Sequence, residues 1–154
     1  MNIKILCYNK LHKEYKEIYN YFLNKLKNNV ILELIEIDEA VNGDLKLIQN
    51  KNEEAISKKL NNLKDYEHIL LEISASQSSS EDFAKMIENN KDFKGAKIAF
   101  IIGPSDGFSQ EFRQKYNNKL SFGKITLPYN LVRIILLEQI YRSIKIIKNE
   151  PYHK

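Results

Sequence analysis

The sequence predicts an α/β fold with a mainly parallel sheet flanked by helices, and three observations support this class. Short apolar runs alternate with segments whose apolar residues recur at helical spacing. The 154 residues are 43% hydrophobic, which is enough for one sizeable core. Only 5 Gly and 3 Pro are present, as expected of a chain rich in regular structure. We therefore expect a single domain over residues 1–154.

The first half of the chain has the pattern of strand, helix, strand and helix. Residues 3–7 and 30–37 are short apolar runs of the kind that form strands. Between them, apolar residues recur at helical spacing, namely Tyr15, Ile18, Tyr19, Phe22, Leu23 and Leu26. Residues 53–63 predict a second helix. This order favours parallel strands joined by helical crossovers.

Two buried strands are predicted next, at residues 69–73 and 97–102. Between them a run of three serines introduces a helix over residues 81–88, because serine hydroxyls cap the first turn of helices. The alternation of strands and helices thus continues through the middle of the chain.

The last third predicts a short helix, a strand and a long helix. Ser109, with Phe112 three residues on, opens the short helix, and residues 124–127 have a strand-like pattern. Pro128 then starts a helix over residues 130–147, whose apolar residues cover more of its circumference than one sheet face would bury. We expect a second copy of the chain to cover the remainder in a homodimer; full enclosure within one subunit is the alternative.

Composition limits the environment and the partners of the chain. The net charge is +4, but residues 1–94 hold 14 Lys and Arg against 16 Asp and Glu, whereas residues 95–154 hold 10 against 4. This asymmetry hints at a polyanionic partner such as a nucleic acid, with a solvated basic face as the alternative. The longest apolar run, residues 98–102, is far too short to cross a bilayer, and no signal peptide is recognisable. We expect a cytoplasmic protein without membrane contact.

Few side chains suggest catalysis. A single cysteine and three scattered histidines predict neither a disulfide nor a metal site, and Cys7 is expected to be a core residue. His153 differs, because it follows Pro151 and lies between Tyr152 and Lys154 at the end of the chain. An aromatic ring, an imidazole and a cation suit an extruded base and its phosphate. A frayed basic tail is the alternative.

Ligands of parallel α/β sheets bind beyond the carboxyl ends of the strands. Three loops are predicted there: one after residues 69–73, one beginning at Gly103 and one around residues 122–127. Gly103 and Gly107 allow close backbone approach to a ligand, although ordinary turns use glycine equally well. The absence of a G-x-G-x-x-G or G-x-x-x-x-G-K-[ST] motif disfavours a conventional dinucleotide or nucleoside triphosphate site.

The same part of the chain resembles the SPOUT class of α/β-knot methyltransferases, and most closely the RlmH family, which methylates a pseudouridine in large-subunit ribosomal RNA. The resemblance spans the full length and is strongest after residue 97. It rests on these groups of residues: Ile102, Gly103, Gly107 and Ser109; Leu120, Ser121 and Phe122; Thr126, Leu127 and Pro128; Leu131, Val132 and Arg133; Glu138, Gln139, Ile140, Tyr141 and Arg142; Glu150, Pro151, Tyr152, His153 and Lys154.

This resemblance implies a deep trefoil knot in the C-terminal part, with the knot and the cofactor site mainly in residues 69–154. It also implies a homodimer whose active sites lie near the interface. The cofactor that the resemblance implies is S-adenosylmethionine, held largely by backbone groups. The resemblance assigns cofactor binding to Leu71, Gly103, Phe122, Gly123, Lys124, Ile125, Thr126 and Leu127.

The implied reaction is methylation of N3 of a pseudouridine in 23S ribosomal RNA, on the large subunit or the assembled ribosome. The enzyme must hold that nitrogen in line with the activated methyl group and assist loss of its proton. The resemblance makes His153, Tyr152 and Arg142 the catalytic residues, and Arg133, Arg142 and Lys154 the RNA contacts. The tail acts in its own site or in that of a partner.

Two positions depart from the family pattern. Pro104 stands where a second glycine is usual and removes a backbone N–H, and Tyr129 stands where a histidine is usual. A knot-fold RNA-binding protein with impaired catalysis is therefore an alternative function. A flavodoxin-like binder of small molecules is a more distant one.

Overall fold

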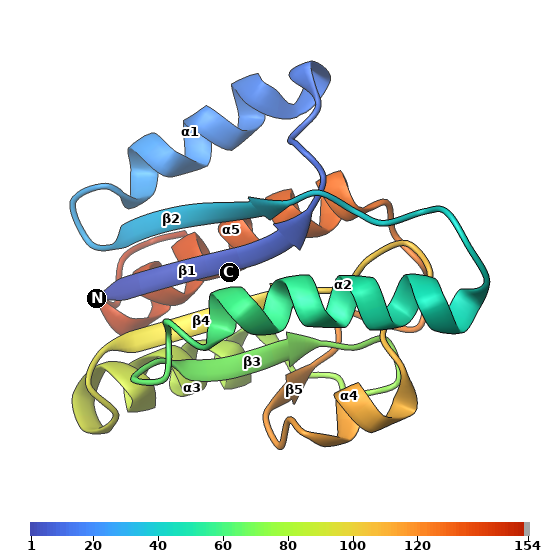
Figure 1. Cartoon of the computed structure of the whole chain (residues 1–154). Helices are drawn as coiled ribbons and strands as arrows, with labels where there is room; N and C mark the ends of the chain where they lie inside the picture. Colours follow the sequence, from blue (N-terminus) through green and yellow to red (C-terminus); the bar gives the residue numbers. More distant parts are fainter. Residues whose placement is uncertain (153–154) are drawn as a thin grey trace.

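The computed structural model describes residues 1–152 and contains one five-stranded sheet in the order β2-β1-β4-β3-β5 (Figure 1). The strands are β1 (Asn2–Tyr8), β2 (Ile31–Ile37), β3 (Glu67–Leu71), β4 (Lys97–Ile102) and β5 (Lys119–Leu120). Every pairing between neighbouring strands is parallel, so the predicted fold class is confirmed.

Helices cover both faces of this sheet. They are η1 (Lys13–Tyr15), α1 (Lys16–Leu26), α2 (Leu45–Leu60), α3 (Ser80–Phe93), α4 (Gln110–Gln114) and α5 (Tyr129–Ile147). Helices α1, α3 and α5 cover one face of the sheet, and α2 and α4 cover the other (Figure 1). The buried side chains on the two faces form two separate cores. No helix within residues 1–152 is long and apolar enough to span a membrane.

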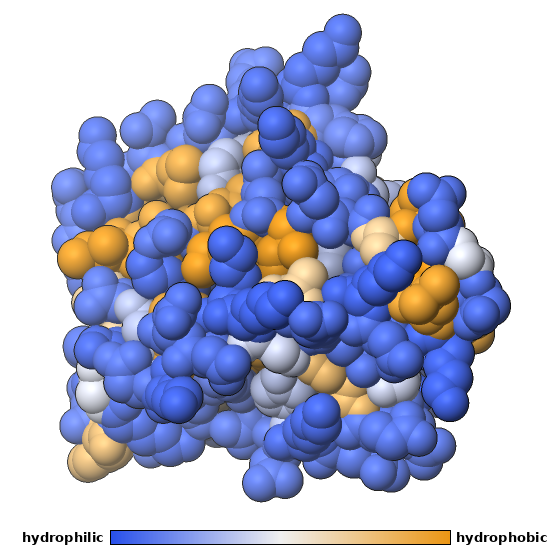
Figure 2. Space-filling model, viewed as in Figure 1, coloured by the Kyte–Doolittle hydropathy of each residue, from blue (hydrophilic) through white to orange (hydrophobic). Residues whose placement is uncertain are grey.

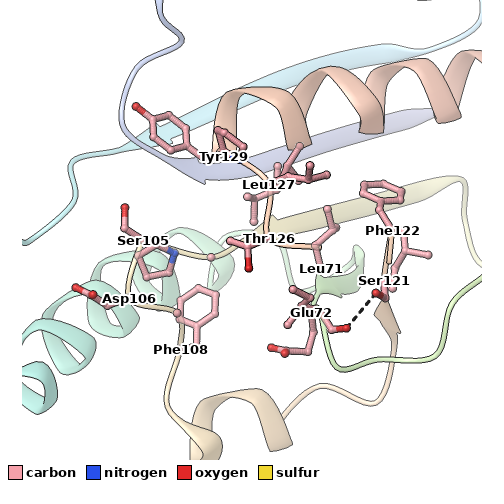
Figure 3. A pocket seen from close by; sticks show the side chains of 18 of the residues that line it. Leu71, Glu72, Ser105, Asp106, Phe108, Ser121, Phe122, Thr126, Leu127 and Tyr129 are labelled. Carbon is pink, nitrogen blue, oxygen red and sulfur yellow. Dashed lines mark hydrogen bonds between the residues drawn. The ribbon is translucent and has the colours of Figure 1, made fainter. Parts of the chain in front are cut away.

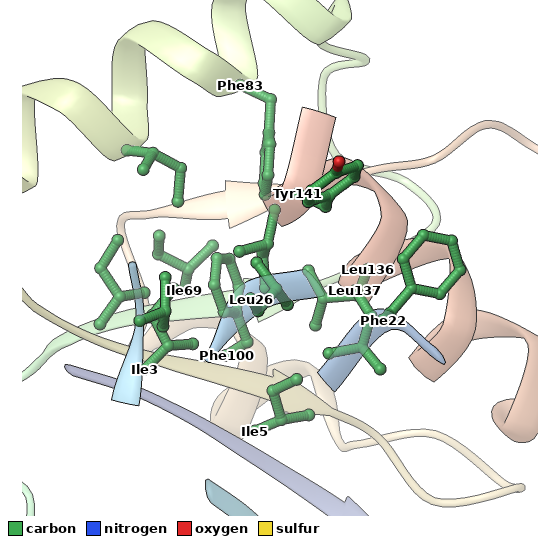
Figure 4. Packing of buried hydrophobic residues seen from close by; sticks show 14 of the residues in the cluster. Ile3, Ile5, Phe22, Leu26, Ile69, Phe83, Phe100, Leu136, Leu137 and Tyr141 are labelled. Carbon is green, nitrogen blue, oxygen red and sulfur yellow. The ribbon is translucent and has the colours of Figure 1, made fainter. Parts of the chain in front are cut away.

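The side chains of the central strand β4 alternate between the two cores of the protein. Ile98 and Phe100 point to the larger core, where Figure 4 shows Phe100 among side chains from α1, α3 and α5. Ala99 and Ile101 point to the smaller core under α2 and α4. Because successive residues of a strand face opposite sides, a strand covered on both faces must be apolar throughout.

Strand β2 forms one edge of the sheet, and its cover is incomplete. Ile31 is 70% exposed, and Figure 2 shows apolar side chains at the surface between α1 and α2. On the same strand, Glu33 forms an ion pair with Lys4 of β1. Charged side chains beside an open edge discourage pairing with a foreign strand.

Several boundaries differ from the predicted ones: β3 lies at residues 67–71 rather than 69–73, and α3 extends to Phe93 rather than to residue 88. Helix α2 begins at Leu45 rather than at residue 53, because the Asp44 carboxylate accepts from the backbone N–H of Leu47 at 2.9 Å and caps the helix there. The predicted strand at residues 124–127 is wrong, since this stretch is irregular and the last strand is β5. Gly123 has a φ of +126°, which ends the extended backbone after β5.

Helix α5 is largely enclosed by its own subunit. It packs against α1 and α3, and its apolar residues Ile134, Leu136, Leu137, Ile140, Tyr141 and Ile144 are all buried. Only Leu131 among the large apolar residues of this helix is as much as 37% exposed. Most of the apolar circumference is therefore explained without a second copy, which was the alternative that the sequence left open.

Candidate functional site

A cavity of about 800 Å³ opens at the carboxyl ends of β3, β4 and β5. Its walls come from the three loops that the sequence predicted: the one after β3, the one between β4 and α4, and the one between β5 and α5 (Figure 3). The start of α5 closes one side with Tyr129 and Val132. The volume lies within the usual range of small-molecule sites.

The predicted cofactor residues gather in this cavity with one exception. The lining includes Leu71, Gly103, Phe122, Gly123, Ile125, Thr126 and Leu127. Lys124 belongs to the same loop but does not line the cavity. Ile125 is 78% exposed, so its side chain lies at the mouth of the cavity.

The loop between β4 and α4 is held in shape at several points. Gly107 has a φ of +68°, and its N–H donates to the carbonyl oxygen of Pro104 at 3.0 Å. A Cβ atom on Gly103 would lie 3.2 Å from the ring of Phe108, so glycine lets this ring pack against the strand end. The lack of an N–H at Pro104 leaves this turn intact, because the turn uses only the carbonyl of Pro104.

Two carboxylates from the first half of the chain support the same loop. Glu39 accepts from the N–H of Ser105 at 2.6 Å, and Glu53 accepts from the N–H of Ser109 at 2.6 Å. The sequence analysis did not identify either glutamate, because the residues around each one do not reveal a hydrogen bond to a loop more than fifty residues away.

Ser121 joins the other two loops. Its hydroxyl accepts from the N–H of Gly123 at 3.1 Å and lies 3.2 Å from the carbonyl oxygen of Ile73 (Figure 3). One short side chain thus links the loop after β3 to the loop before α5.

Tyr129 connects the cavity to the loop after β1. Its hydroxyl lies 2.8 Å from Nε2 of His12, and the two rings meet edge to face. The guanidinium of Arg133 lies 5.1 Å from the centre of the Tyr129 ring. This tyrosine, which departs from the family pattern, therefore has partners of its own at the rim of the cavity.

Arg133 is not a surface residue. Its side chain is 0% exposed, and its guanidinium donates to the carbonyl oxygens of Tyr8 and Asn9 and lies 3.3 Å from a carboxylate oxygen of Glu36. A guanidinium enclosed in this way cannot reach a phosphate. The prediction that Arg133 contacts RNA is therefore wrong, and the residue joins α5 to the end of β1.

Arg142 and Tyr152 lie together near the other end of α5. Arg142 donates to a carboxylate oxygen of Glu138 at 2.6 Å, and the hydroxyl of Tyr152 donates to the same oxygen at 3.2 Å. The Arg142 guanidinium lies 4.9 Å from the centre of the Tyr152 ring. Burial, with the Glu138 charge as a second cause, raises the pKa of Tyr152, so its phenol stays protonated at neutral pH. His153 and Lys154 lie outside the described residues.

The cavity and this tail are not brought together within one chain. Tyr129, at the cavity, and Arg142 are 13 positions apart on α5, which corresponds to roughly 20 Å along the helix axis. Neither Arg142 nor Tyr152 lines the cavity. Arg142 and Tyr152, the predicted catalytic residues within residues 1–152, therefore lie in a different region of the subunit from the predicted cofactor residues.

Known proteins resemble this chain over its full length. A protein with 49% identity from Mycoplasma mycoides subsp. mycoides and one with 39% identity from Bacillus thuringiensis subsp. konkukian are both named Ribosomal RNA large subunit methyltransferase H. Each alignment covers 100% of both chains. A solved structure described as a probable methylase family protein from Haemophilus influenzae has a TM-score of 0.55 at 14% identity. The match covers 96% of this chain and 66% of that chain, and it supports the fold alone.

The family model described as Predicted SPOUT methyltransferase matches residues 1–153. The match includes all three loops of the cavity and the helix that follows them. Together with the full-length relatives, it shows that this chain belongs to the SPOUT methyltransferase family.

Proposed function

We propose that this chain is a ribosomal RNA methyltransferase that transfers a methyl group from S-adenosylmethionine to N3 of a pseudouridine in 23S ribosomal RNA. The observation that carries the proposal is the cavity at the carboxyl edge of the sheet, formed by the three loops where the cofactor was predicted. The names of the full-length relatives support the substrate class. A single small domain has little surface for reading a nucleotide sequence, which favours the assembled ribosome as substrate. A ribosomal substrate in turn favours the cytoplasm as the location of the protein.

The cavity has the chemistry that the cofactor requires. Its apolar lining, which includes Leu71, Phe108 and Phe122, suits an adenine ring, and the nearby backbone groups can bond to the edge of that ring. Gly103 and Gly123 keep side chains out of the space beside the loops. Bound there, S-adenosylmethionine would supply a methyl group already activated on a sulfonium.

We further propose that the loops of the cavity are part of a trefoil knot in residues 69–154. The three lining loops and α5 all lie in this part of the chain. Tracing the chain past these loops in an experimental structure tests this proposal. An unthreaded C-terminal helix would contradict it.

The separation of tail and cavity supports a homodimer. A tail of five residues after Asn149 spans at most about 18 Å when extended, which is less than the roughly 20 Å of helix α5 that separates Arg142 from the cavity. A second copy whose α5 runs past the cavity would instead bring the tail of one subunit to the cavity of the other. Ile73, Ile125 and Leu131 are exposed apolar residues near the cavity, at 44%, 78% and 37%, and a partner subunit would bury them.

In this arrangement the tail residues act on the RNA. The protonated phenol of Tyr152 and the guanidinium of Arg142 would orient the base, and Arg142 with Lys154 would bind its phosphates. His153 would accept the proton from N3 of the pseudouridine. Glu138 holds Arg142 and Tyr152 in one cluster. The RNA must therefore either displace the Glu138 carboxylate from these two side chains or bind to them while they remain bonded to it.

Two measurements test this function. Calorimetry with S-adenosylmethionine should show binding to the purified protein, and mass spectrometry should show 23S ribosomal RNA that lacks the methyl group in a strain without the gene. Absence of cofactor binding would favour the alternative of an RNA-binding protein without methyl transfer. Cofactor binding with fully methylated RNA in the deletion strain would exclude the proposed substrate.

A further inference from the structure

Two side chains of opposite charge lie together in the wall of the cavity. Glu72 follows the last residue of β3, and Arg113 belongs to α4. Nη1 of Arg113 lies 3.4 Å from Oε1 of Glu72. Their side chains are 37% and 13% exposed, so the carboxylate in particular is sheltered from water. Figure 3 shows Glu72 beside Leu71, with its carboxylate directed away from the Ser121 side.

Both groups have unused hydrogen-bonding capacity. Oε1 of Glu72 accepts from the N–H of Ser74 at 3.3 Å and from its hydroxyl at 3.0 Å, whereas Oε2 has no hydrogen bond within residues 1–152. Nε of Arg113 is buried and has no partner there either. Because the pair is joined by one long contact, neither charge is fully compensated.

The remaining lining makes this pair distinctive. Most other lining residues are apolar, are glycines or carry hydroxyl groups, and the third charged residue, Asp106, lies on the loop after β4 (Figure 3). The part of the cavity near Glu72 and Arg113 thus offers an anion and a cation side by side. A neutral sugar or base cannot compensate both charges, but a zwitterion can.

We propose that Glu72 and Arg113 bind the amino-acid end of the methyl donor. The carboxylate of Glu72 accepts from the α-ammonium group, and the guanidinium of Arg113 donates to the α-carboxylate. The adenosine end then lies along the apolar lining. This inference rests on the proposed function, since it takes S-adenosylmethionine as the occupant of the cavity.

Truncated ligands separate this role from a structural one. The probes are S-adenosylmethionine, S-adenosylhomocysteine and 5′-methylthioadenosine, which lacks the amino-acid end. Glu72→Gln keeps the shape of the side chain and its contacts to Ser74, and Arg113→Gln removes the guanidinium. Glu111→Gln removes a charge from the same short helix outside the cavity lining and is the control.

We expect Glu72→Gln and Arg113→Gln each to raise the Kd of the first two ligands by about tenfold or more, the usual effect of losing a charged hydrogen bond. The Kd of 5′-methylthioadenosine should change by less than about twofold. An equal loss for all three ligands would show a structural role, and a loss for S-adenosylmethionine alone would show contact with the sulfonium instead. Unchanged affinities would also overturn the inference. Failure of the unaltered protein to bind S-adenosylmethionine would contradict the proposed function itself.

Discussion

Nη2 of Arg133 donates to the carbonyl oxygen of Asn9 at 2.7 Å. Asn9 has a φ of +61°, so the arginine binds a left-handed residue that follows directly after β1. Tyr129, one turn earlier on α5, reaches the same loop through His12. These contacts join the start of the last helix to the end of the first strand, and they set the position of the cavity wall that α5 provides.

Replacing Arg133 with methionine should lower the free energy of unfolding by about 3 kcal/mol. The carbonyl oxygens of Tyr8 and Asn9 would lose their donor, and Glu36 would lose its charge partner. Urea denaturation measures the change. Lys85→Met, at a side chain that is 76% exposed, is the control and should leave the unfolding midpoint unchanged. Normal stability with weakened RNA binding would instead restore Arg133 to the RNA-contacting surface.

The sequence predicted those parts of the fold and site whose signals are local. Strand β4 was placed at its observed bounds because a strand covered on both faces is apolar throughout, and Gly103 was placed in the cavity because glycine follows a strand end. Strand β5 was missed because two residues carry no periodicity. Arg133 was misassigned because a basic residue resembles a phosphate contact until its partners in β1 are known.

Glu53 and Glu54 offer a matched test of how the cavity loop is held. Glu53 accepts from the N–H of Ser109, whereas Glu54 pairs with Lys58 on the surface of α2. Glu53→Ala should raise the Kd for S-adenosylmethionine by about fivefold, because the loop loses a charged acceptor at its end. Calorimetry on both variants gives the comparison, with Glu54→Ala expected to bind as the unaltered protein does. Equal affinities in the two variants would show that Glu53 does not shape the cavity.

The burial of Cys7 makes the free energy of unfolding depend on pH, and it also sets the direction of that dependence. Burial is the main cause that raises the pKa of the Cys7 thiol from 9.0 to about 12, with the positive charge of Arg133 opposing it. Between these values the thiol ionises in the unfolded chain but not in the folded one. The folded state therefore loses stability as the pH rises above 9, by about 1 to 2 kcal/mol at pH 10.

The comparison with Cys7→Ala isolates this contribution, because all other titrating groups are shared. Substitution removes a buried sulfur and should lower stability at pH 8. The difference between the two proteins in unfolding free energy should then shrink as the pH is raised to 10. A constant difference across this range would mean that the thiol ionises equally in both states.

The last prediction concerns whether the C-terminal residues 152–154 act in the cavity of their own subunit or in that of a partner subunit. Removing residues 152–154 should abolish methyl transfer while leaving affinity for S-adenosylmethionine within a few fold, since Tyr152 does not line the cavity. Gly103→Leu should abolish binding of S-adenosylmethionine and therefore methyl transfer as well, because even a Cβ atom there lies 3.2 Å from the Phe108 ring and a larger side chain must displace it. Each variant alone is expected to be inactive.

Mixing the two variants distinguishes the two arrangements. If each tail serves the cavity of the partner, a mixed dimer has one complete site, and random exchange should restore about a quarter of normal activity, because half of the dimers are mixed and each has one of two sites intact. If each tail serves its own cavity, mixed dimers have no complete site and the mixture stays inactive. Native mass spectrometry must confirm exchange of subunits before the activity is compared. Activity in the mixture would also account for the distance along α5 that separates Tyr129 from Arg142 within one chain.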